Sequence, residues 1–467
     1  MPGHRSSAIL FSMENKPPQR NIALTVSVLS AFVVPFMGSS VNIALPSIGR
    51  EFSLDAVMLN WIATAYILSA AMLLLPFGKV ADMRGRARML ISGITVMMLA
   101  SLGCALAGSE TVLIACRFAQ GMGGAIIFGT STAILTSVFP ANERGKVLGY
   151  TVASTYFGLS CGPVLGGFLV HNLGWRSIFW VTVPLCAAAF IAALRLDRRH
   201  EPDLKKFDFA GSLLYGISLV SLVYGFSLLP RVSGAVSVIL GMAGIAGFIV
   251  LENTIPNPLL NISLFVKNRV FAFSNLSALI NYSATFATGF LLSLYLQYVK
   301  GLSPQHAGMV LIFQPVVMAL FSPFAGRLSD RIEPRIVSSA GMALCCTGIF
   351  LLSRIQNNTG MTFIMADLAV LGLGFALFSS PNTNAVMSSV ERKDYGVASA
   401  TLGTMRMVGQ MLSMGVAMLV IALFVGKVKI TPEYFPQFLR SVQVCFAIFA
   451  VLCFAGIFSS LVRGKLR

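Results

Sequence analysis

Apolar blocks of about 20 residues recur along almost the whole chain, and they constrain its fold more than any other feature. Examples are residues 22–45, 89–106 and 441–461. A helix of about 20 residues crosses the roughly 30 Å hydrocarbon core of a bilayer, a length that a soluble core helix does not need. Hydrophobic residues make up 56% of the chain and charged residues only 11%, which argues against a soluble domain. The sequence therefore predicts an all-α, polytopic membrane protein.

The apolar blocks predict fourteen spans, which two longer polar connections at residues 195–207 and 253–268 divide into six, two and six. The spans lie near residues 22–45, 57–77, 88–108, 110–136, 146–170, 176–194, 209–229, 234–252, 269–297, 304–326, 335–354, 361–387, 395–425 and 438–462. The predicted organisation is a cytoplasmic N-terminal tail (1–21), an N-terminal six-span half (22–194), a linker with two extra spans (195–268), a C-terminal six-span half (269–462) and a cytoplasmic tail (463–467).

The distribution of positive charge predicts the orientation in the membrane. A net charge of +17 would suggest a nucleic-acid partner for a soluble protein, but here Lys and Arg lie in short loops at every second turn of the chain. Roughly 24 of the 34 fall in the termini and even-numbered loops, and about 8 in the odd-numbered loops. The positive-inside rule then places both termini in the cytoplasm, so we expect a multi-pass plasma-membrane protein with no nucleic-acid partner.

Two further features limit the possible chemistry. The first apolar block is followed by Asn42 and Pro46 rather than a small-residue cleavage site, which predicts an uncleaved signal anchor. All eight cysteines lie inside apolar blocks without a CxxC pair, so we expect packing roles rather than disulfides or a metal site, and no cofactor.

An internal repeat supports the division into halves. The loop that begins at Gly78 and contains Asp82 is echoed by the loop that begins at Gly326 and contains Asp330, with the same spacing from glycine to aspartate. Eight spans fit between the two aspartates, whereas six would require longer loops than the sequence shows. Transporter folds are commonly built from such repeats.

Two motifs lie inside predicted spans. Span 4 contains Arg117-Phe-Ala-Gln120-Gly121, and an arginine within a span needs a partner or a wet cavity unless it lies near enough to the surface to snorkel. Span 5 contains a run of glycines around Pro163, spaced so that they line one helical face and allow close helix contact. The proline removes one backbone hydrogen bond and favours a kink, which a simple packing seam does not require.

Over nearly the whole chain, these motifs resemble the major facilitator superfamily, and more narrowly its fourteen-span drug:proton antiporter family. The resemblance implies two six-helix halves with two inserted helices. It also implies a cytoplasmic gate, for which the alternative is a plain basic loop, and an antiporter hinge motif in span 5. The gate residues are Gly78, Asp82, Arg84, Arg86, Arg88, Asp330 and Arg331, and the hinge residues are Gly158, Gly162, Pro163, Gly166 and Gly167. The Trp175-Arg176 pair and Asp208 also resemble the family, although Asp208 is equally explained as a helix N-cap.

The chain departs from the family at the acid that most of these antiporters carry in span 1, because the aligned residue is Met37. Proton coupling needs a titratable group, and the alternative acids are Asp367 in span 12 and Glu110 at the start of span 4. Glu110 is also explained as a favourable charge at a helix N-terminus. Together with the embedded Arg117 and Arg406, these acids are the candidates for proton or charge coupling.

Polar residues inside spans prefer the bundle interior, so they are candidates for a substrate cavity, although such side chains also join helices to one another. The candidates are Asn42, Tyr66, Gln120, Tyr156, Asn281, Tyr282, Gln314, Asn382 and Asn384.

The sequence favours a secondary active transporter that exports small amphipathic compounds by proton antiport with alternating access. Because two arginines are embedded and the span 1 acid is missing, neutral or anionic substrates have as much weight as cationic ones. The sequence has no phosphate-binding loop, and its predicted loops carry no nucleophile elbow, so we expect neither an ATP-driven pump nor an enzyme. The alternatives are a facilitator without proton coupling and a receptor or channel derived from the same fold. We expect a monomer whose partners are a small-molecule substrate, lipid and protons.

Overall fold

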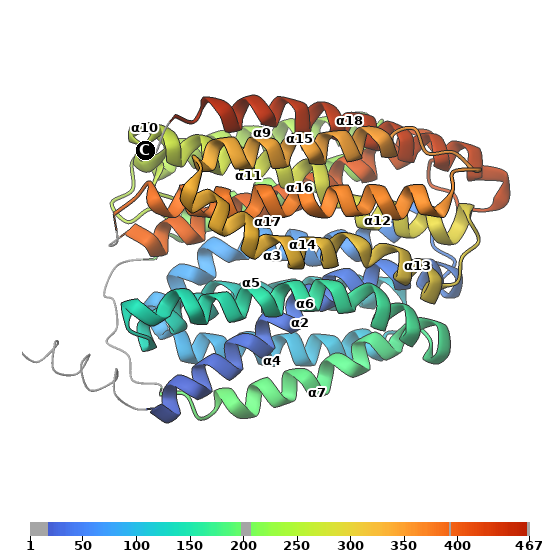
Figure 1. Ribbon diagram of the computed structural model, residues 1–467. Coiled ribbons are helices and arrows are strands. Elements are labelled where there is room, and N and C mark those ends of the chain that lie inside the picture. The colour runs from blue at the N-terminus through green and yellow to red at the C-terminus, as the bar shows by residue number, and fades with distance from the viewer. Residues whose placement is uncertain (1–16, 198–206, 392–393, 465–467) are drawn as a thin grey trace, which may run out of the picture.

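The computed structural model describes residues 17–197, 207–391 and 394–464, and it is built from helices that run roughly parallel to one long axis (Figure 1). Fourteen helices in these ranges are long and apolar enough to cross a membrane, which confirms the predicted number. Most of both predicted tails and the linker segment 198–206 lie outside the described residues. Several helices extend beyond the predicted spans, because a helix can continue past the hydrocarbon core.

Six helices form the N-terminal half, in the lower part of Figure 1. They are α2 (Pro17–Glu51), α3 (Ala56–Arg84), α4 (Arg86–Ala105), α5 (Glu110–Val138), α6 (Ala141–Leu173) and α7 (Arg176–Ala193). The side chains of Asp55 and Ser109 accept hydrogen bonds from the first turns of α3 and α5, which is why these helices begin there. Gly85 separates α3 from α4 at a φ of 101°, a conformation that favours glycine.

Six spans form the C-terminal half, in the upper part of Figure 1. The first span comprises α11 (Arg269–Thr285), α12 (Ala287–Leu294) and the π-helix η1 (Tyr295–Val299); the second comprises α13 (Pro304–Leu311) and α14 (Phe313–Arg331). The remaining spans are α15 (Pro334–Leu352), α16 (Met361–Ser388), α17 (Tyr395–Phe424) and α18 (Phe435–Val462), which follows the short 3₁₀ helix η3 (Pro432–Tyr434). A short helix, α10 (Ile262–Lys267), precedes this half.

The repeat seen in the sequence is present in the packing. In the N-terminal half α4 crosses α5 where Gly93 meets Gly123, and in the C-terminal half α15 crosses α16 where Gly341 meets Gly374. At each crossing a Cβ on either glycine would press on backbone atoms of the other helix. Small residues at equivalent places therefore allow the same close helix contact in both halves.

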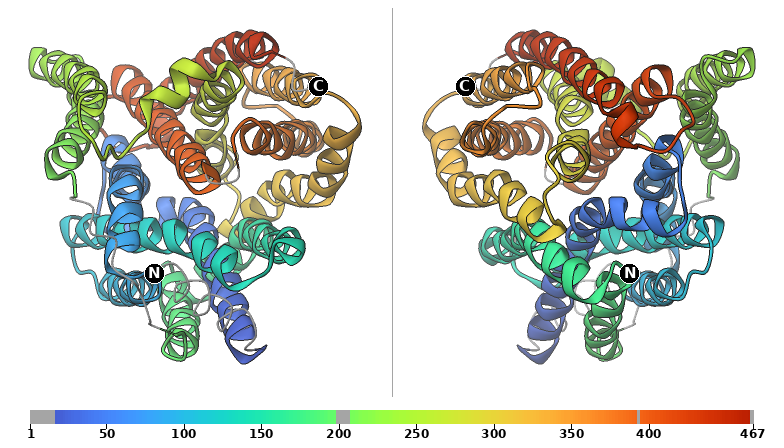
Figure 2. Two further views of the ribbon diagram at one scale, coloured as in Figure 1. Left: turned by 90° about the vertical axis from the view of Figure 1, so that its left-hand side faces the viewer. Right: turned by 90° about the vertical axis from the view of Figure 1, so that its right-hand side faces the viewer.

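The two inserted helices, α8 (Phe209–Leu228) and α9 (Val232–Glu252), lie at the edge of the molecule (Figure 2). Helix α8 contacts both halves: the Tyr215 hydroxyl donates to the Ala71 carbonyl of α3 at 3.1 Å, and Phe226 packs on Gly415 of α17. Asp208 caps α8 by accepting a bond from the Gly211 amide at 2.8 Å. The second carboxyl oxygen of Asp208 and one of Glu252 converge on the same Gly211. Two carboxyl groups thus lie side by side where the ends of the inserted pair meet.

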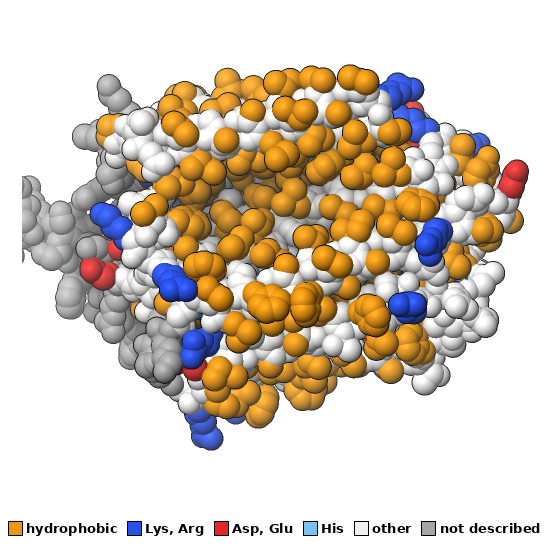
Figure 3. Space-filling model, turned by 90° about the horizontal axis from the view of Figure 1, so that it is seen from above, with side chains coloured by type: hydrophobic (Ala, Val, Ile, Leu, Met, Phe, Trp, Pro, Cys, Tyr) orange, Lys and Arg blue, Asp and Glu red, His pale blue; other side chains and the backbone are white. Residues whose placement is uncertain are grey.

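The surface has the distribution of polarity expected of a membrane protein. Figure 3 shows hydrophobic side chains over the middle of one face and Lys, Arg, Asp and Glu side chains gathered toward its two ends. The loops are numbered in chain order, so that loop 1 connects the first two spans. The described chain ends, Pro17 and Gly464, lie at the same end as the even-numbered loops, and we call this the even-loop end. The opposite end carries the odd-numbered loops and is called the odd-loop end.

Direct contacts between the halves gather at the odd-loop end. The Ser293 hydroxyl and the Gln297 amide donate to backbone carbonyls near the end of α2, at 2.7 and 3.0 Å. The Asn60 amide of α3 donates to the Met414 carbonyl of α17 at 3.4 Å, and the Ala56 amide donates to the Val428 carbonyl at 3.1 Å. The structure is therefore closed between the halves at this end.

A clasp within the N-terminal half lies at the same end. The Glu51 carboxylate accepts a bond from the Trp175 indole at 2.6 Å and pairs with Arg176 at 2.7 Å. Arg176 also donates to the Ala107 carbonyl at 2.9 Å, so three loops are tied together. This clasp gives the Trp175-Arg176 pair a structural role.

Candidate functional site

An arginine and two tyrosines meet between the halves, each near the middle of its span. Arg406 is on α17, Tyr282 on α11 and Tyr156 on α6. The Arg406 guanidinium lies 5.7 Å from the centre of the Tyr282 ring. Tyr156 comes from the N-terminal half and lies near both residues. Three candidates that are far apart in the sequence are thus brought together.

The guanidinium of Arg406 is only partly satisfied. One terminal nitrogen donates to the Thr383 hydroxyl of α16 at 2.6 Å, whereas Nε is buried and has no hydrogen-bond partner. Among the described residues Arg406 forms no ion pair with a carboxylate. A cation placed in this way can bind an acceptor group of a ligand, and an anionic acceptor gives the stronger bond.

Aromatic and hydroxyl groups surround this arginine. Phe375 of α16 meets the Tyr282 ring edge to face, with 5.2 Å between ring centres. The Tyr156 hydroxyl lies against Ser322 of α14 and Ser379 of α16, both in the opposite half. The arrangement offers flat apolar faces for an aromatic ring and several hydroxyl groups that donate or accept hydrogen bonds.

Arg117 lies in a separate and fully packed network within the N-terminal half. Only 1% of this residue is exposed. Its Nε donates to the Ile62 carbonyl at 3.2 Å, and a terminal nitrogen donates to the Gln120 side chain at 2.7 Å. Gln120 in turn donates to the Ser101 hydroxyl at 2.8 Å, and the guanidinium lies 4.5 Å from the centre of the Tyr66 ring. These contacts hold α3, α4 and α5 together, so Tyr66 and Gln120 surround Arg117.

Glu110 is the first residue of α5, directly after the capping Ser109, and it is partly exposed. No ion pair among the described residues joins it to Arg117. Its position agrees with the favourable interaction between an acid and a helix N-terminus.

Asp367 is a buried acid of the C-terminal half. It is 3% exposed, and neither carboxyl oxygen has a hydrogen-bond partner in the described part of the chain. One oxygen faces Gly348 of α15. The side-chain amide of Asn281 of α11 is fully buried, forms no hydrogen bond with the described residues, and lies beside Cys345, one turn from Gly348. Two unpartnered polar groups therefore face the same part of α15, apart from Arg406.

The gate candidates lie at the even-loop end, where each half forms polar contacts of its own. Asp82 pairs with Arg86 at 2.9 Å, and Arg86 donates to the Ala133 carbonyl of α5 at 3.2 Å. In the other half the Asn384 amide donates to Asp330 at 3.3 Å. Arg84, Arg88 and Arg331 are exposed, and a Cβ on Gly78 would meet nothing within 4 Å.

The glycines of the hinge motif divide between two contacts. Gly158, Gly162 and Gly166 pack against α2, where a Cβ would press on Phe32, Ser39 and Ser40 respectively. Gly167 faces Pro304 of α13, and the Pro163 carbonyl faces Gly308. Helix α6 thus contacts its own half along one face and the opposite half near its odd-loop end.

The remaining cavity candidates have separate environments. The Asn42 carbonyl accepts the bond from Ser293 at the closed end, and the side chain of Gln314 is half-buried beside the α14 and α16 contact at Gly372. Asn382 accepts a bond from Arg463 at 2.9 Å and donates to the Ser274 carbonyl at 3.1 Å.

Sequence reasoning missed Arg463, which lies just after the last span. It is 1% exposed and also donates to Ser274 and Ser338, so it joins α18 to α11, α15 and α16. Burial lowers the pKa of Arg463 to about 10, and the guanidinium stays charged at neutral pH. The only signal for this role was the position of an arginine directly behind an apolar block. Ser322, Ser379 and Thr383 were also missed, because serine and threonine are common within spans.

These features define a helical membrane protein made of two similar halves, the architecture of a transporter. The chain belongs to the Major Facilitator Superfamily, whose family model matches residues 27–274 and 274–465. It is 30% identical over 397 residues to the riboflavin transporter RibZ of Clostridioides difficile (strain 630), covering 83% of this chain and 85% of that protein. It is also 30% identical over 402 residues to the multidrug resistance protein Stp of Mycobacterium tuberculosis (strain CDC 1551 / Oshkosh), covering 85% of this chain and 74% of that protein.

The fold is similar to solved transporters. The POT family transporter PepTSo superimposes with a TM-score of 0.71 at 15% sequence identity, covering 96% of this chain and 98% of that chain. At this identity the similarity concerns the fold. The family match and the relatives show a multi-pass membrane transporter of small molecules that resembles multidrug-efflux proteins.

Proposed function

We propose that this protein exports small amphipathic compounds from the cytoplasm in exchange for protons, by alternating access. The observation that supports this most directly is the central cluster of Arg406, Tyr282 and Tyr156 between the halves. Binding sites of secondary transporters lie near the midplane between the repeats, which is where this cluster lies.

The chemistry of the cluster favours neutral or anionic compounds with a flat ring. Arg406 offers a buried Nε without a partner and no carboxylate accompanies it among the described residues, so a cationic substrate would be repelled. Tyr282 and Phe375 offer faces on which a ring can pack. Riboflavin, named for one relative, is a planar ring system with carbonyl acceptors, and such a compound suits these groups.

Asp367 is the residue that we propose carries the proton. A carboxylate buried without hydrogen bonds is costly, and binding a proton removes its charge. In this role it would replace the acid that most of the antiporters resembled here carry in span 1, where this chain has Met37. Met37 is itself fully buried and faces Thr182 of α7. The buried, unpartnered Asn281 nearby suggests room for a polar path in this part of the half.

We also propose that both termini lie in the cytoplasm and that the transporter is monomeric. The halves contact each other at the odd-loop end, so this orientation places the closed end away from the cytoplasm, as an exporter that takes up its substrate from the cytoplasm requires. A reporter fused to the C-terminus tests the orientation: a signal from outside the cell would contradict it.

The test uses purified protein in liposomes that contain a pH-sensitive dye. Aromatic compounds that are cationic, neutral or anionic are added, and substrate flux and proton movement are measured together. The wild type is compared with Asp367→Asn and with Glu433→Gln, a matched control that removes an exposed acid in the short helix η3 before α18.

Substrate-driven proton movement that is lost in Asp367→Asn and kept in Glu433→Gln supports both parts of the proposal. Proton movement that persists in Asp367→Asn leaves antiport standing and removes Asp367 as the carrier. Substrate flux without proton movement in the wild type refutes antiport and leaves a facilitator, the second candidate function, which the missing span 1 acid favours.

A further inference from the structure

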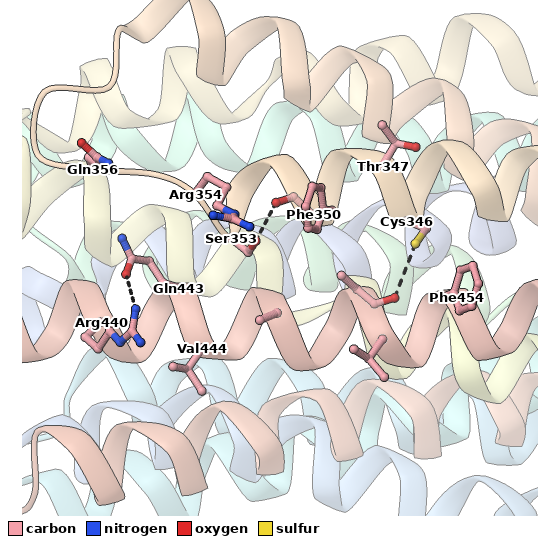
Figure 4. Close-up of a pocket in the computed structure, with 13 residues that line it drawn as sticks. Cys346, Thr347, Phe350, Ser353, Arg354, Gln356, Arg440, Gln443, Val444 and Phe454 are labelled. Atoms are coloured by element: carbon pink, nitrogen blue, oxygen red, sulfur yellow. Dashed lines mark hydrogen bonds between the residues drawn. The ribbon is translucent and has the colours of Figure 1, made fainter.

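A groove of about 1290 Å³ runs along the outer surface between α15 and α18 (Figure 4). It lies on the side of the C-terminal half that faces away from the N-terminal half, so it is separate from the central cluster (Figure 1). Much of its wall is apolar and open: Phe350 is 50% exposed, Val451 70% and Phe454 56%. Such a wall fits the acyl chain of a lipid, but any lipid-facing surface is apolar.

The polar end of the groove distinguishes it from an ordinary lipid-facing surface. Arg354, in the turn that follows α15, and Arg440 from α18 line the same end of the groove, as Figure 4 shows. Gln443 braces this end: it accepts a bond from Arg440 at 3.4 Å and donates to the Ile355 carbonyl at 2.7 Å. Arg354 lies 5.5 Å from the Phe350 ring centre. Neither arginine forms an ion pair with a carboxylate of the described chain.

The position of these arginines adds to the argument. Both lie at the odd-loop end, which carries fewer Lys and Arg residues than the even-loop end. Arg440 also lies in the second turn of α18, near the positive end of the helix dipole, where a cation is unfavourable. Two unpaired cations beside a helix N-terminus form a site with a strong preference for an anion.

We propose that this groove binds an anionic phospholipid. Its phosphate group lies between Arg354 and Arg440, and one acyl chain follows the groove past Phe350, Val451 and Phe454. Basic pockets between transmembrane helices hold anionic head groups on the cytoplasmic side of membranes, and here the same pairing of arginine with phosphate is proposed at the opposite side. The apolar groove that continues from the arginines favours a lipid over a soluble anion. The site joins α15 to α18 from outside, and it does not depend on what the central cluster transports.

The experiment measures lipid binding to the full-length detergent-purified protein by native mass spectrometry and by thermal unfolding. The probes are phosphatidylglycerol, phosphatidylcholine with the same acyl chains, and inorganic phosphate. The wild type is compared with the double variant Arg354→Gln/Arg440→Gln and with Arg231→Gln, which removes an exposed arginine at the same end of the molecule but outside the groove.

Phosphatidylglycerol is expected to bind and to raise the unfolding temperature, with phosphatidylcholine much weaker. The double variant should bind phosphatidylglycerol about thirtyfold more weakly, which is the effect of removing two basic residues from an anionic surface. Arg231→Gln should bind like the wild type. Equal binding of the two lipids, or unchanged binding in the double variant, would overturn the proposal.

Two further results test whether the ligand is a lipid rather than a soluble anion and whether its acyl chain lies in the groove. Protection by inorganic phosphate equal to that by phosphatidylglycerol would overturn the lipid assignment in favour of a soluble anion. Val451→Trp fills the groove and keeps both arginines, so it tests whether an acyl chain lies in the groove. This variant also replaces the double variant in the test if the double variant does not fold. Wild-type affinity in Val451→Trp would refute the placement of the chain in the groove.

Discussion

Replacing Arg406 by glutamine should separate anionic substrates from neutral ones. The guanidinium keeps one bond, to Thr383 at 2.6 Å, and its Nε has no hydrogen-bond partner among the described residues. A hydrogen bond that involves a charged group contributes about 1.5–3 kcal/mol, which corresponds to roughly a 10- to 150-fold change in affinity. Glutamine keeps a donor but loses the charge, so the larger loss falls on a substrate whose acceptor is anionic.

The assay compares two transported compounds that differ only in charge, an aromatic carboxylate and its methyl ester, by their KM in proteoliposomes. Arg406→Gln should raise the KM of the carboxylate at least tenfold and that of the ester less than about threefold. Arg406→Lys keeps the charge but loses the planar guanidinium, so it should raise the KM of the carboxylate less than Arg406→Gln does. Arg231→Gln, at an exposed loop, is the control. Equal changes for both compounds would refute the role of Arg406 as the anion-binding group.

Three other perturbations test the packing. Arg463→Gln leaves Asn382 and Ser338 without their donor and should lower the unfolding temperature, by an amount equivalent to about 1–3 kcal/mol; an unchanged temperature would contradict the buried network. Glu252→Gln should keep the unfolding temperature of the wild type, because the new amide can donate to the unpartnered Asp208 oxygen. Glu252→Ala should lower the unfolding temperature. Equal decreases in the two variants would exclude a pairing between residues 252 and 208. Gly308→Val should abolish transport while the protein remains folded by size-exclusion chromatography, because a side chain there presses on α6 and keeps the odd-loop end from closing; full transport would show that this contact is dispensable.

The fold could be predicted because its signals are local. Spans are recognised by length and hydrophobicity, and helix starts by residues such as Asp55 and Ser109. The repeat could be predicted from the echo of Asp82 in Asp330, and the structure shows the matching helix crossings at Gly123 and Gly374. Each of these inferences needs only neighbouring residues or a comparison within the chain.

The site was less accessible, because it depends on which face each helix turns inward. Arg117 and Arg406 are both embedded arginines in the sequence. The structure gives Arg117 two acceptors and a tyrosine ring within its own half, whereas it leaves Nε of Arg406 unsatisfied between the halves. An apolar helix has no polar face that would reveal its orientation, so sequence alone assigns both arginines the same role. Their separation into a packing arginine and a binding candidate is a result of the fold.

The docking of the inserted helices could not be predicted from the sequence either. The sequence predicts α8 and α9 as spans, but apolar residues lie all around each helix, so the sequence does not indicate which face packs against the halves. In the structure α8 is bonded through Tyr215 to Ala71 of α3, but it meets α17 through the apolar contact of Phe226 with Gly415. A hydrogen bond fixes a direction, whereas an apolar contact between a ring and a glycine can slide. When the halves move against each other, we therefore expect the inserted pair to stay with the N-terminal half and to slip along α17, so that two additional helices do not lock the halves together.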